Sequence, residues 1–136
     1  MLKRFSISLE EDLLADFDQV ILDKKYKNRS EAIRDLIRNS FVENEWVDDK
    51  DVMGVITLVF DHHQPNLQEK ITELQHGLFQ QIVSTTHVHM DHHNCMEVII
   101  VKGKAGDVAR LSDDLNSLRG VRNCRLAMSS KGKHLH

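Results

Sequence analysis

The sequence has 136 residues, of which 40% are hydrophobic and 29% are charged, and its formal net charge is −3. This composition is typical of a globular protein with one domain or two small ones, and no apolar run approaches the ~18 residues that a membrane helix needs. The negative charge argues against general binding to polyanions. Because the N-terminus lacks the apolar core of a signal peptide, we expect a cytoplasmic location.

The first predicted element is a strand over residues 4–9, where apolar and polar residues alternate strictly. Such alternation is typical of a short strand with one buried face. The apolar face would carry Phe5, Ile7 and Leu9, and the polar face Arg4, Ser6 and Ser8.

Two helices are predicted next. Residues 10–25 have an apolar stripe, acidic residues at the start and lysines at the end, which suits the helix dipole. After a turn at residues 26–29, Ser30 is expected to cap a second helix that frays through residues 42–46. The two stripes are Leu13, Leu14, Phe17, Val20 and Ile21, then Ala32, Ile33, Leu36, Ile37 and Phe41.

One strand and two helices cannot readily build a core alone, and a lone strand leaves its backbone groups unpaired. A symmetric dimer solves both problems, because two strands then pair and four helices close over their apolar face. The paired strands would form a ribbon that fits the DNA major groove, where Arg4, Ser6 and Ser8 could contact base edges. The start of the second helix, at Arg29 and Ser30, offers backbone N–H groups to a phosphate.

This segment resembles the ribbon-helix-helix family of DNA-binding proteins in residues 4–9, in residues 28–34 and in both apolar stripes. The alternative is a dimerisation module with no DNA role, because residues 1–46 hold 8 Lys and Arg against 10 Asp and Glu. DNA binding would then depend on a local basic face that includes Lys3, Arg4, Lys27 and Arg29. We favour DNA binding because short polar residues beside an arginine suit a ribbon that reads bases.

Residues 47–51 are charged and predict a linker between domains at residues 1–46 and 52–136. In the second domain, buried or alternating patterns predict strands at 52–60, 82–90, 96–101 and 121–128. Helices are expected after Pro65 and over residues 107–119. The predicted order is βαββαβ, the ferredoxin-like arrangement, so the whole chain is expected to be an α+β protein.

The segment from residue 74 to residue 95 holds the most informative residues. It contains His76, the pair His87 and His89, and Cys95. Three imidazoles and one thiolate are ligands that first-row transition metals prefer. His87 and His89 are two apart in a strand pattern, so their side chains are expected on one face.

The direction of Cys95 depends on the hairpin loop that precedes it. A three-residue loop pairs His89 with Glu97 and places both, with His87 and Cys95, on one face, whereas a two- or four-residue loop turns Cys95 to the other face. Glu97 could then accept the second N–H of His89, although a solvated glutamate is equally compatible. The alternative to a metal site is a buried Cys95 beside solvated histidines.

The two halves together resemble the nickel-responsive transcriptional regulators, from residue 3 to about residue 128. The most specific shared pattern is His-x10-His-x-His-x5-Cys, and residues 29–34 and 101–108 are further similar stretches. The resemblance implies an ACT-like second domain. It also implies a homotetramer in which two DNA-binding dimers flank four regulatory domains.

The same resemblance implies one Ni(2+) per chain at a subunit interface. His87, His89 and Cys95 match ligands from one subunit, and His76 matches the ligand from its neighbour. Three imidazoles and one thiolate in a tetragonal or planar set suit Ni(II) or Cu(II), whereas Zn(II) prefers a tetrahedron. Nickel binding would promote binding to an operator, which we expect to be palindromic, and would repress nickel uptake.

Other residues have weaker assignments. The resemblance implies a secondary cation site at Glu31 and Asp35, for which a solvated helix face is the alternative. We expect the remaining histidines to be loop or tail residues, with extra metal sites as the alternative for the first four: His62, His63, His92, His93, His134 and His136. Cys124 is expected to be a packed strand thiol.

Two other functions are compatible with the sequence. The same architecture could respond to cobalt or copper, or the protein could store or carry a metal while the N-terminal domain only dimerises. An enzyme is not expected, because no nucleophile has a positioned base and four protein ligands leave no open position for a substrate.

Overall fold

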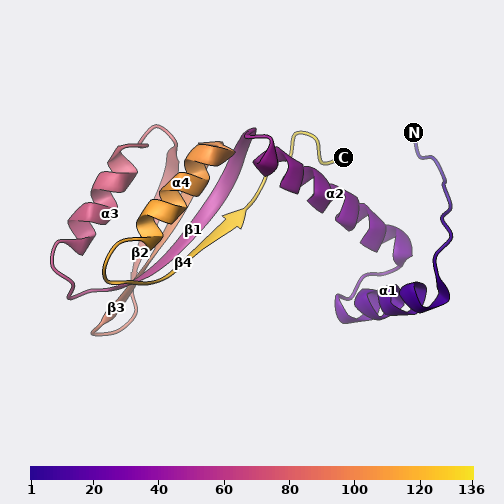
Figure 1. The fold of residues 1–136 in the computed structure, drawn as a ribbon, viewed down its shortest axis with the longest axis horizontal. Helices are drawn as coiled ribbons and strands as arrows, with labels where there is room; N and C mark the ends of the chain where they lie inside the picture. Colours follow the sequence, from indigo (N-terminus) through magenta and orange to yellow (C-terminus); the bar gives the residue numbers. More distant parts are fainter. The chain divides into compact units, whose positions relative to one another are not determined.

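The structure, a computed structural model, describes all residues 1–136, which divide into two compact units, Met1–Asn39 and Ser40–His136. The chain contains four helices and four strands (Figure 1). None of the helices has the length and apolar character needed to cross a membrane.

The N-terminal unit contains helix α1 (Glu11–Asp23) and the first part of helix α2 (Arg29–Val47). The cap of α2 differs from the prediction. The side-chain oxygen of Asn28 accepts a hydrogen bond from the backbone N–H of Glu31 at 2.9 Å, so Asn28 caps the helix and Ser30 lies in its first turn. Asparagine is as good a cap as serine, and it comes first in the chain.

Residues 1–10 form no strand within the single chain. Phe5 and Ile7, predicted on the apolar face, are 70% and 58% exposed. A strand exists only where another strand pairs with its backbone groups, and the single chain supplies no partner for this segment. The predicted strand therefore differs from the structure of one chain, and its formation requires a second chain.

Helix α2 continues through Val47, past the region where fraying was expected. Its last turns are held within the C-terminal unit. The indole N–H of Trp46 donates to the backbone oxygen of Ser129 at 2.9 Å, and the Glu45 carboxylate accepts from the hydroxyl of Ser130 at 3.1 Å. These tertiary contacts stabilise a segment that has weak helical propensity in isolation.

The C-terminal unit has the predicted βαββαβ order. Its elements are β1 (Asp51–Asp61), α3 (Leu67–His76), β2 (Ile82–His89), β3 (Asn94–Lys104), α4 (Ala105–Asn116) and β4 (Val121–Met128). The strands form one sheet in the order β2-β3-β1-β4, and every neighbouring pair is antiparallel. The α+β fold class predicted from the sequence is confirmed.

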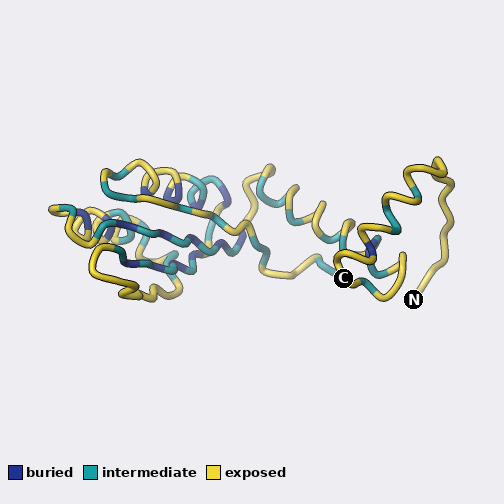
Figure 2. Tube along the Cα trace, turned by 90° about the horizontal axis from the view of Figure 1, so that it is seen from below, coloured by how far each residue is buried: buried dark blue, intermediate teal, exposed yellow.

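Helices α3 and α4 cover one face of this sheet (Figure 1). Residues alternate between buried and half-buried along β1 and β3, so the core lies between these strands and the helices (Figure 2). Its largest fully buried side chains are Phe60, Ile56, Leu58, Ile71, Ile99 and Leu115. The other face of the sheet is also largely apolar but only half-buried, and carries Val55, Thr57, Val59, Met96, Val98 and Ile100.

The hairpin between β2 and β3 is longer than predicted. His89 pairs with Cys95 and His87 pairs with Glu97, so five residues, not three, separate the first pair. The Asp91 carboxylate closes this turn by accepting the backbone N–H groups of His93 and Asn94 at 2.7 and 2.8 Å. Because five is also an odd number, the predicted shared face of His87, His89, Cys95 and Glu97 is retained.

Candidate metal centre

Cys95 lies at the start of β3, where its side chain is fully buried. Burial raises the pKa of the Cys95 thiol, and the nearby carboxylates of Asp91 and Glu97 raise it further. A buried thiol with a raised pKa is protonated at neutral pH unless a cation replaces the proton. The Cys95 thiol therefore becomes a thiolate ligand only if a metal ion can reach it.

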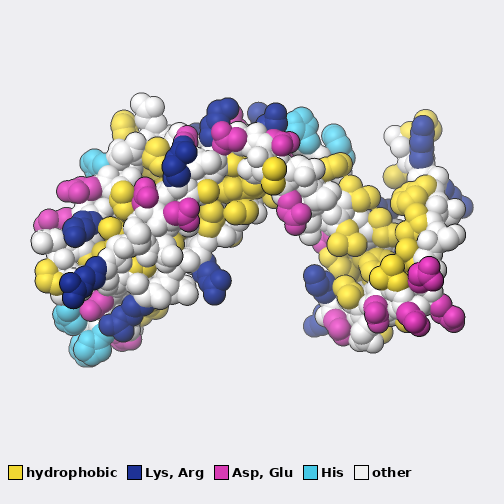
Figure 3. Space-filling model, in the orientation of Figure 1, with side chains coloured by type: hydrophobic (Ala, Val, Ile, Leu, Met, Phe, Trp, Pro, Cys, Tyr) yellow, Lys and Arg dark blue, Asp and Glu magenta, His cyan; other side chains and the backbone are white.

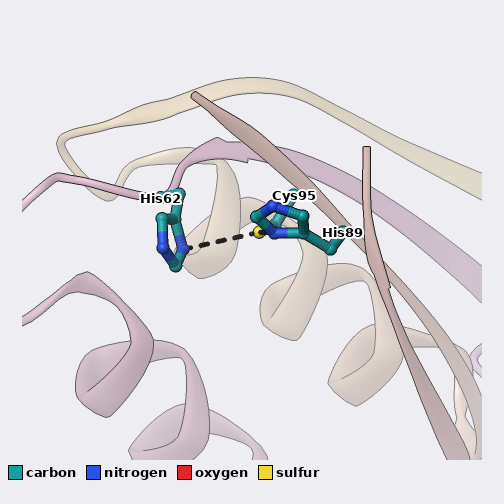
Figure 4. Close-up of side chains that lie close together, drawn as sticks. All are labelled: His62, His89 and Cys95. Carbon is teal, nitrogen blue, oxygen red and sulfur yellow. Dashed lines mark hydrogen bonds between the residues drawn. The ribbon is translucent and has the colours of Figure 1, made fainter. Parts of the chain in front are cut away.

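Two imidazoles lie beside this thiol (Figure 4). The Sγ atom of Cys95 is 3.5 Å from Nδ1 of His89 and 3.7 Å from Nδ1 of His62. One ligand atom from each of the three residues lies within 4.8 Å of the other two. Two nitrogens and one sulfur at such separations can share a first-row transition ion after small side-chain rotations.

Three separate elements position these donors. His62 follows the end of β1, His89 ends β2, and Cys95 lies near the start of β3. The pairing of Asp61 with Asn94 brings the end of β1 beside Cys95, and the pairing of His89 with Cys95 adds the second imidazole. The site is thus a product of strand register and forms within one chain.

His62 was predicted to be a loop histidine and is the residue that sequence reasoning missed. The available signal was the repeat of Asp-His-His in residues 61–63 and 91–93, which flank the neighbouring strands β1 and β3. Antiparallel pairing of those strands places both loops at the same end of the sheet. Without the register of β1 against β3, the proximity of His62 to Cys95 could not be derived.

His87 lies on the same face but belongs to a different set of contacts. Its Nδ1 atom is 3.4 Å from Oε1 of Glu97, which is 3% exposed. The side-chain amides of Gln68 and Gln75, both on α3, donate to the two oxygens of Glu97 at 3.0 Å each. The expected partner of Glu97 was His89, and the longer loop shifts it to His87.

A small cavity of about 230 Å³ opens between His62 and His87 and is also lined by Phe60, Gln68 and Glu69. His76 is exposed at the end of α3 and is not part of the donor group. Within one chain the structure therefore brings His89 and Cys95 together with His62. It places His87 two ladder positions away, beyond the Val88–Met96 pair, and His76 at the surface.

Comparison with known proteins identifies what kind of centre this is. Residues 53–129 match the family described as "NikR C terminal nickel binding domain", and residues 3–40 match "Ribbon-helix-helix protein, copG family". The chain is 66% identical over 136 residues to a protein from Desulfotalea psychrophila, with 100% of both chains covered. The chain belongs to the nickel-responsive regulator family.

Further relatives support this family assignment. A Geobacter sulfurreducens protein is 48% identical over 134 residues, covering 98% of this chain and 96% of its own. A Thermococcus kodakarensis protein is 48% identical over 133 residues, covering 97% and 96%. All three relatives are named "Putative nickel-responsive regulator". An uncharacterized protein of known structure, TM1266 from Thermotoga maritima, shares the fold, with a TM-score of 0.52 and 16% identity, over 57% of this chain and 96% of its own.

Membership of this family confirms the predicted regulator class. The C-terminal unit belongs to a nickel-binding domain family, so Ni(2+) is the metal that its donors serve. The imidazole and thiol donors fit a borderline ion of this kind. The N-terminal match is to a ribbon-helix-helix domain, a DNA-binding fold, so the family is one of transcriptional regulators.

The residues predicted to contact DNA lie in the N-terminal unit of this nickel-responsive regulator. Arg4, Ser6 and Ser8 are exposed in the extended segment before α1. Arg29 forms two hydrogen bonds of 2.9 Å with Asp18, and this pairing lowers the pKa of the Asp18 carboxyl. Ser30 is exposed in the first turn of α2.

The two acids expected at a secondary cation site already have partners within the single chain. Glu31 forms an ion pair with Arg34. Asp35 accepts a hydrogen bond from the hydroxyl of Tyr26, which raises the pKa of that tyrosine. A cation at this site would therefore have to compete with an arginine and displace a phenol hydroxyl.

Proposed function

We propose that the protein is a nickel-dependent transcriptional repressor, in which nickel binding promotes binding to an operator and represses nickel uptake. The observation that carries this proposal is the pairing of the buried Cys95 thiol with His89 across the β2–β3 ladder. It supplies a nickel-suited donor pair in a chain that also carries a ribbon-helix-helix domain.

The proposed ligands are His87, His89 and Cys95 of one subunit and His76 of a neighbouring subunit, with one Ni(2+) per chain. The shared face of the first three residues supports this set. The exposed position of His76 at the end of α3 supports its role toward a second subunit. Bound Ni(II) would supply coordinate bonds that join two subunits.

Glu97 is proposed to fix the geometry of this centre. Its carboxylate contacts His87 and accepts two hydrogen bonds from α3, the helix that ends at His76. A partner of this kind orients a metal-binding imidazole and raises its basicity. Glu97 therefore links a ligand on the strand to the helix that carries the ligand for the neighbour.

A homotetramer formed as a dimer of dimers is proposed for the assembly. Hydrophobic side chains gather on the surface of the N-terminal unit (Figure 3), and Phe5, Leu13 and Leu36 are each more than half exposed. Pairing of two such units would form the ribbon-helix-helix dimer of residues 1–46, followed by a linker at 47–51. The half-buried apolar face of the C-terminal sheet, in the ACT-like domain of residues 52–136, offers a second surface for association.

DNA binding is proposed to use Arg4, Ser6 and Ser8 on base edges and the start of α2 at Arg29 and Ser30 on phosphates. A two-fold dimer favours a palindromic operator. Nickel can raise operator affinity only if it binds more tightly to the arrangement of subunits that fits the DNA. A ligand shared between subunits meets this condition, because it forms only in particular arrangements.

An anaerobic nickel titration of the reduced protein tests the proposal. Absorption and gel shift are measured on the same samples, with an operator selected from random duplexes. One nickel per chain, a thiolate-to-nickel absorption band, and DNA binding that follows nickel occupancy are the expected results. Stoichiometric nickel binding without any effect on DNA would instead indicate metal storage or a different effector metal.

A further inference from the structure

The last turns of α2 are held by contacts that the proposed metal centre does not use. The boundary between the two compact units falls between residues 39 and 40, inside this helix. Residues 47–51, predicted as a linker, therefore lie in the same compact unit as the metal donors. A helix that continues from one unit into the other can transmit movement only where its end is firmly held.

Trp46 anchors this end of α2. Its ring packs against the hydrophobic core and lies over Gly54 of β1. A Cβ atom at Gly54 would come within 3.3 Å of Cη2 of Trp46 and 2.8 Å of Cγ1 of Val108 on α4, so glycine leaves room for both side chains. The indole N–H donates to the backbone oxygen of Ser129 at 2.9 Å, which satisfies the polar part of a partly buried ring. Packing and a hydrogen bond therefore both hold Trp46 in place.

The C-terminal tail, residues 129–136, passes beside the same turns of α2 (Figure 1). The hydroxyl oxygen of Ser130 lies 3.1 Å from both carboxylate oxygens of Glu45, to which it donates. The same oxygen accepts the backbone N–H of Gly132 at 3.0 Å, and the positive φ of Gly132, 81°, turns the tail at this point. The start of the tail is thus bonded to the helix, whereas a chain end without such contacts is poorly ordered.

The end of α2 has the hydrogen bonds of a Schellman motif. The backbone N–H of Lys50 donates to the oxygen of Glu45 at 2.9 Å, and that of Asp49 donates to the oxygen of Trp46 at 3.4 Å. Asp49 occupies the left-handed position of this motif, with a φ of 54°. Glycine is the favoured residue at that position, because a Cβ atom is strained there.

The side chain of Asp49 has a partner on another helix. Its carboxylate accepts the backbone N–H of Gly106, in the first turn of α4, at 2.7 Å. Lys104, the residue before α4, supplies no side-chain cap, so Asp49 provides both the acceptor and the negative charge that a helix start favours. Next to it, the backbone N–H of Ala105 donates to the oxygen of Lys50 at 2.9 Å. An aspartate where the backbone favours glycine indicates a role for its side chain.

We propose that Trp46, Asp49, Ser129 and Ser130 form a clamp that fixes the end of α2 to the C-terminal sheet and α4, and that this clamp transmits the arrangement of the C-terminal units to the DNA-binding unit. With the clamp closed, residues 47–51 are a rigid joint, and the last turns of α2 move together with the sheet. The same helix begins at the residues proposed to contact phosphates. The effect on DNA rests on the proposed function, whereas the clamp itself does not.

The clamp is tested in the full-length double variant Asp49→Gly/Ser130→Ala. Glycine suits the left-handed backbone, so the variant removes side-chain contacts and keeps the end of the helix. Trp46 is the only tryptophan of the chain, so its fluorescence reports on this site alone. Its emission is expected to shift to longer wavelength, and the backbone amide of Gly106 should exchange about 2- to 10-fold faster, the effect of one net hydrogen bond.

The matched control is the double variant Asp49→Asn/Ser130→Thr. Asparagine removes the same charge as glycine but keeps a side-chain oxygen that can accept from Gly106, and it tolerates the left-handed backbone. Threonine keeps the hydroxyl that donates to Glu45. This variant should therefore retain the emission and the amide exchange of the unmodified protein, and thermal melting checks that both variants fold.

Transmission is tested by gel shift with the operator selected from random duplexes, with and without Ni(2+). Nickel should raise operator affinity in the unmodified protein and the control, by the about 5- to 150-fold that coupled sites show. The Asp49→Gly/Ser130→Ala variant should lose most of this increase, while its thiolate-to-nickel band and its nickel-free DNA affinity stay the same. A purely stabilising clamp would leave the ratio of the two affinities unchanged.

Unchanged Trp46 emission and Gly106 exchange in the Asp49→Gly/Ser130→Ala variant would overturn the clamp. An unchanged ratio of affinities, or an equal loss in the control, would overturn its role in transmission. If nickel has no effect on DNA binding by the unmodified protein, the proposed function fails, while the fluorescence and exchange measurements still decide the clamp.

Discussion

The buried carboxylate of Glu97 lies opposite His87 in the β2–β3 ladder, with Oε1 3.4 Å from Nδ1 of the imidazole. The same carboxylate accepts hydrogen bonds from Gln68 and Gln75 on α3. A nearly buried charge is costly unless such donors satisfy it. Glu97 thus connects α3 to β2, the strand that carries the proposed ligands His87 and His89.

Replacement of Glu97 by glutamine should weaken nickel binding by about 10- to 100-fold, the range found when a partner of a metal-binding histidine is lost. The glutamine amide keeps the shape but loses the charge, and its NH2 group cannot accept a hydrogen bond from α3. Competition titration with a chelator measures the affinity, and circular dichroism checks that the variant folds. Glu73→Gln, an exposed change on α3, is the control. Equal affinity in both variants would contradict the role of Glu97.

Replacement of Cys95 by serine should abolish the thiolate-to-nickel band and nickel-dependent DNA binding, because a hydroxyl is a poor ligand for a borderline ion. The chain should still fold and assemble, since serine is similar in size to cysteine and the core around it is unchanged. Absorption, gel shift and sedimentation measure the three properties. Cys124→Ser, a change at the other cysteine, should leave the band intact. Nickel-dependent repression in cells by Cys95→Ser would refute the site.

The sequence was sufficient to predict most of the C-terminal fold. The apolar runs of β1 and β3 and the apolar stripes of α3 and α4 predict buried elements, and the βαββαβ order follows from them. The shared face of His89 and Cys95 was also predictable, because any odd loop length gives it. The loop length itself was not, since it depends on the turn that Asp91 closes.

Other features depended on contacts that a sequence pattern does not contain. The position of His62 beside Cys95 requires the register of β1 against β3. Continuation of α2 through Val47 requires the contact of Trp46 with Ser129, which is 83 residues away in the chain. The strand predicted for residues 4–9 depends on a second chain, so a single chain cannot show it.

Removal of the Arg29 side chain charge should raise the pKa of Asp18 toward its ordinary value. Arg29 donates two hydrogen bonds to this carboxylate, and the hydrogen bonds hold its pKa below the usual range. The pair therefore stabilises the fold above the ordinary carboxyl pKa, and this stabilisation is lost as the pH falls through the lowered value. A pH titration of the Asp18 carboxyl by NMR in Arg29→Gln measures the shift. An unchanged Asp18 pKa would show that the pair does not form in solution, and Asp12 serves as the control carboxyl.

Replacement of Arg4 by alanine should reduce discrimination at one operator position by about 1–3 kcal/mol, the value of a specific base contact. Affinities for the operator and for a set of single-base variants measure this loss. Lys3→Ala is the control, because a phosphate contact would weaken binding to all sequences and lower the salt dependence by about one unit of slope. Equal affinity of the unmodified protein for operator and scrambled DNA would contradict the ribbon interface.

Replacement of Ile7 by aspartate should prevent the N-terminal segments of two chains from pairing. Ile7 is 58% exposed in the single chain. Burial of such a side chain between two chains would stabilise the dimer by about 1.5–3 kcal/mol. An aspartate at this position would instead place a charge in the apolar interface, at a large cost. Hydrogen exchange should show protected backbone amides over residues 4–9 in the unmodified protein and rapid exchange in the variant.

The same variant separates the two proposed association surfaces. Operator binding should be lost because the ribbon is absent, while the thiolate-to-nickel band should remain because its ligands lie in the C-terminal unit. Ser8→Ala, on the opposite face of the segment, should keep the amide protection and so distinguishes loss of pairing from loss of a DNA contact. Rapid exchange of these amides in the unmodified protein, or full operator affinity in Ile7→Asp, would mean that the segment does not form the dimer ribbon. DNA recognition would then have to rest on α2 and on the basic residues near its start.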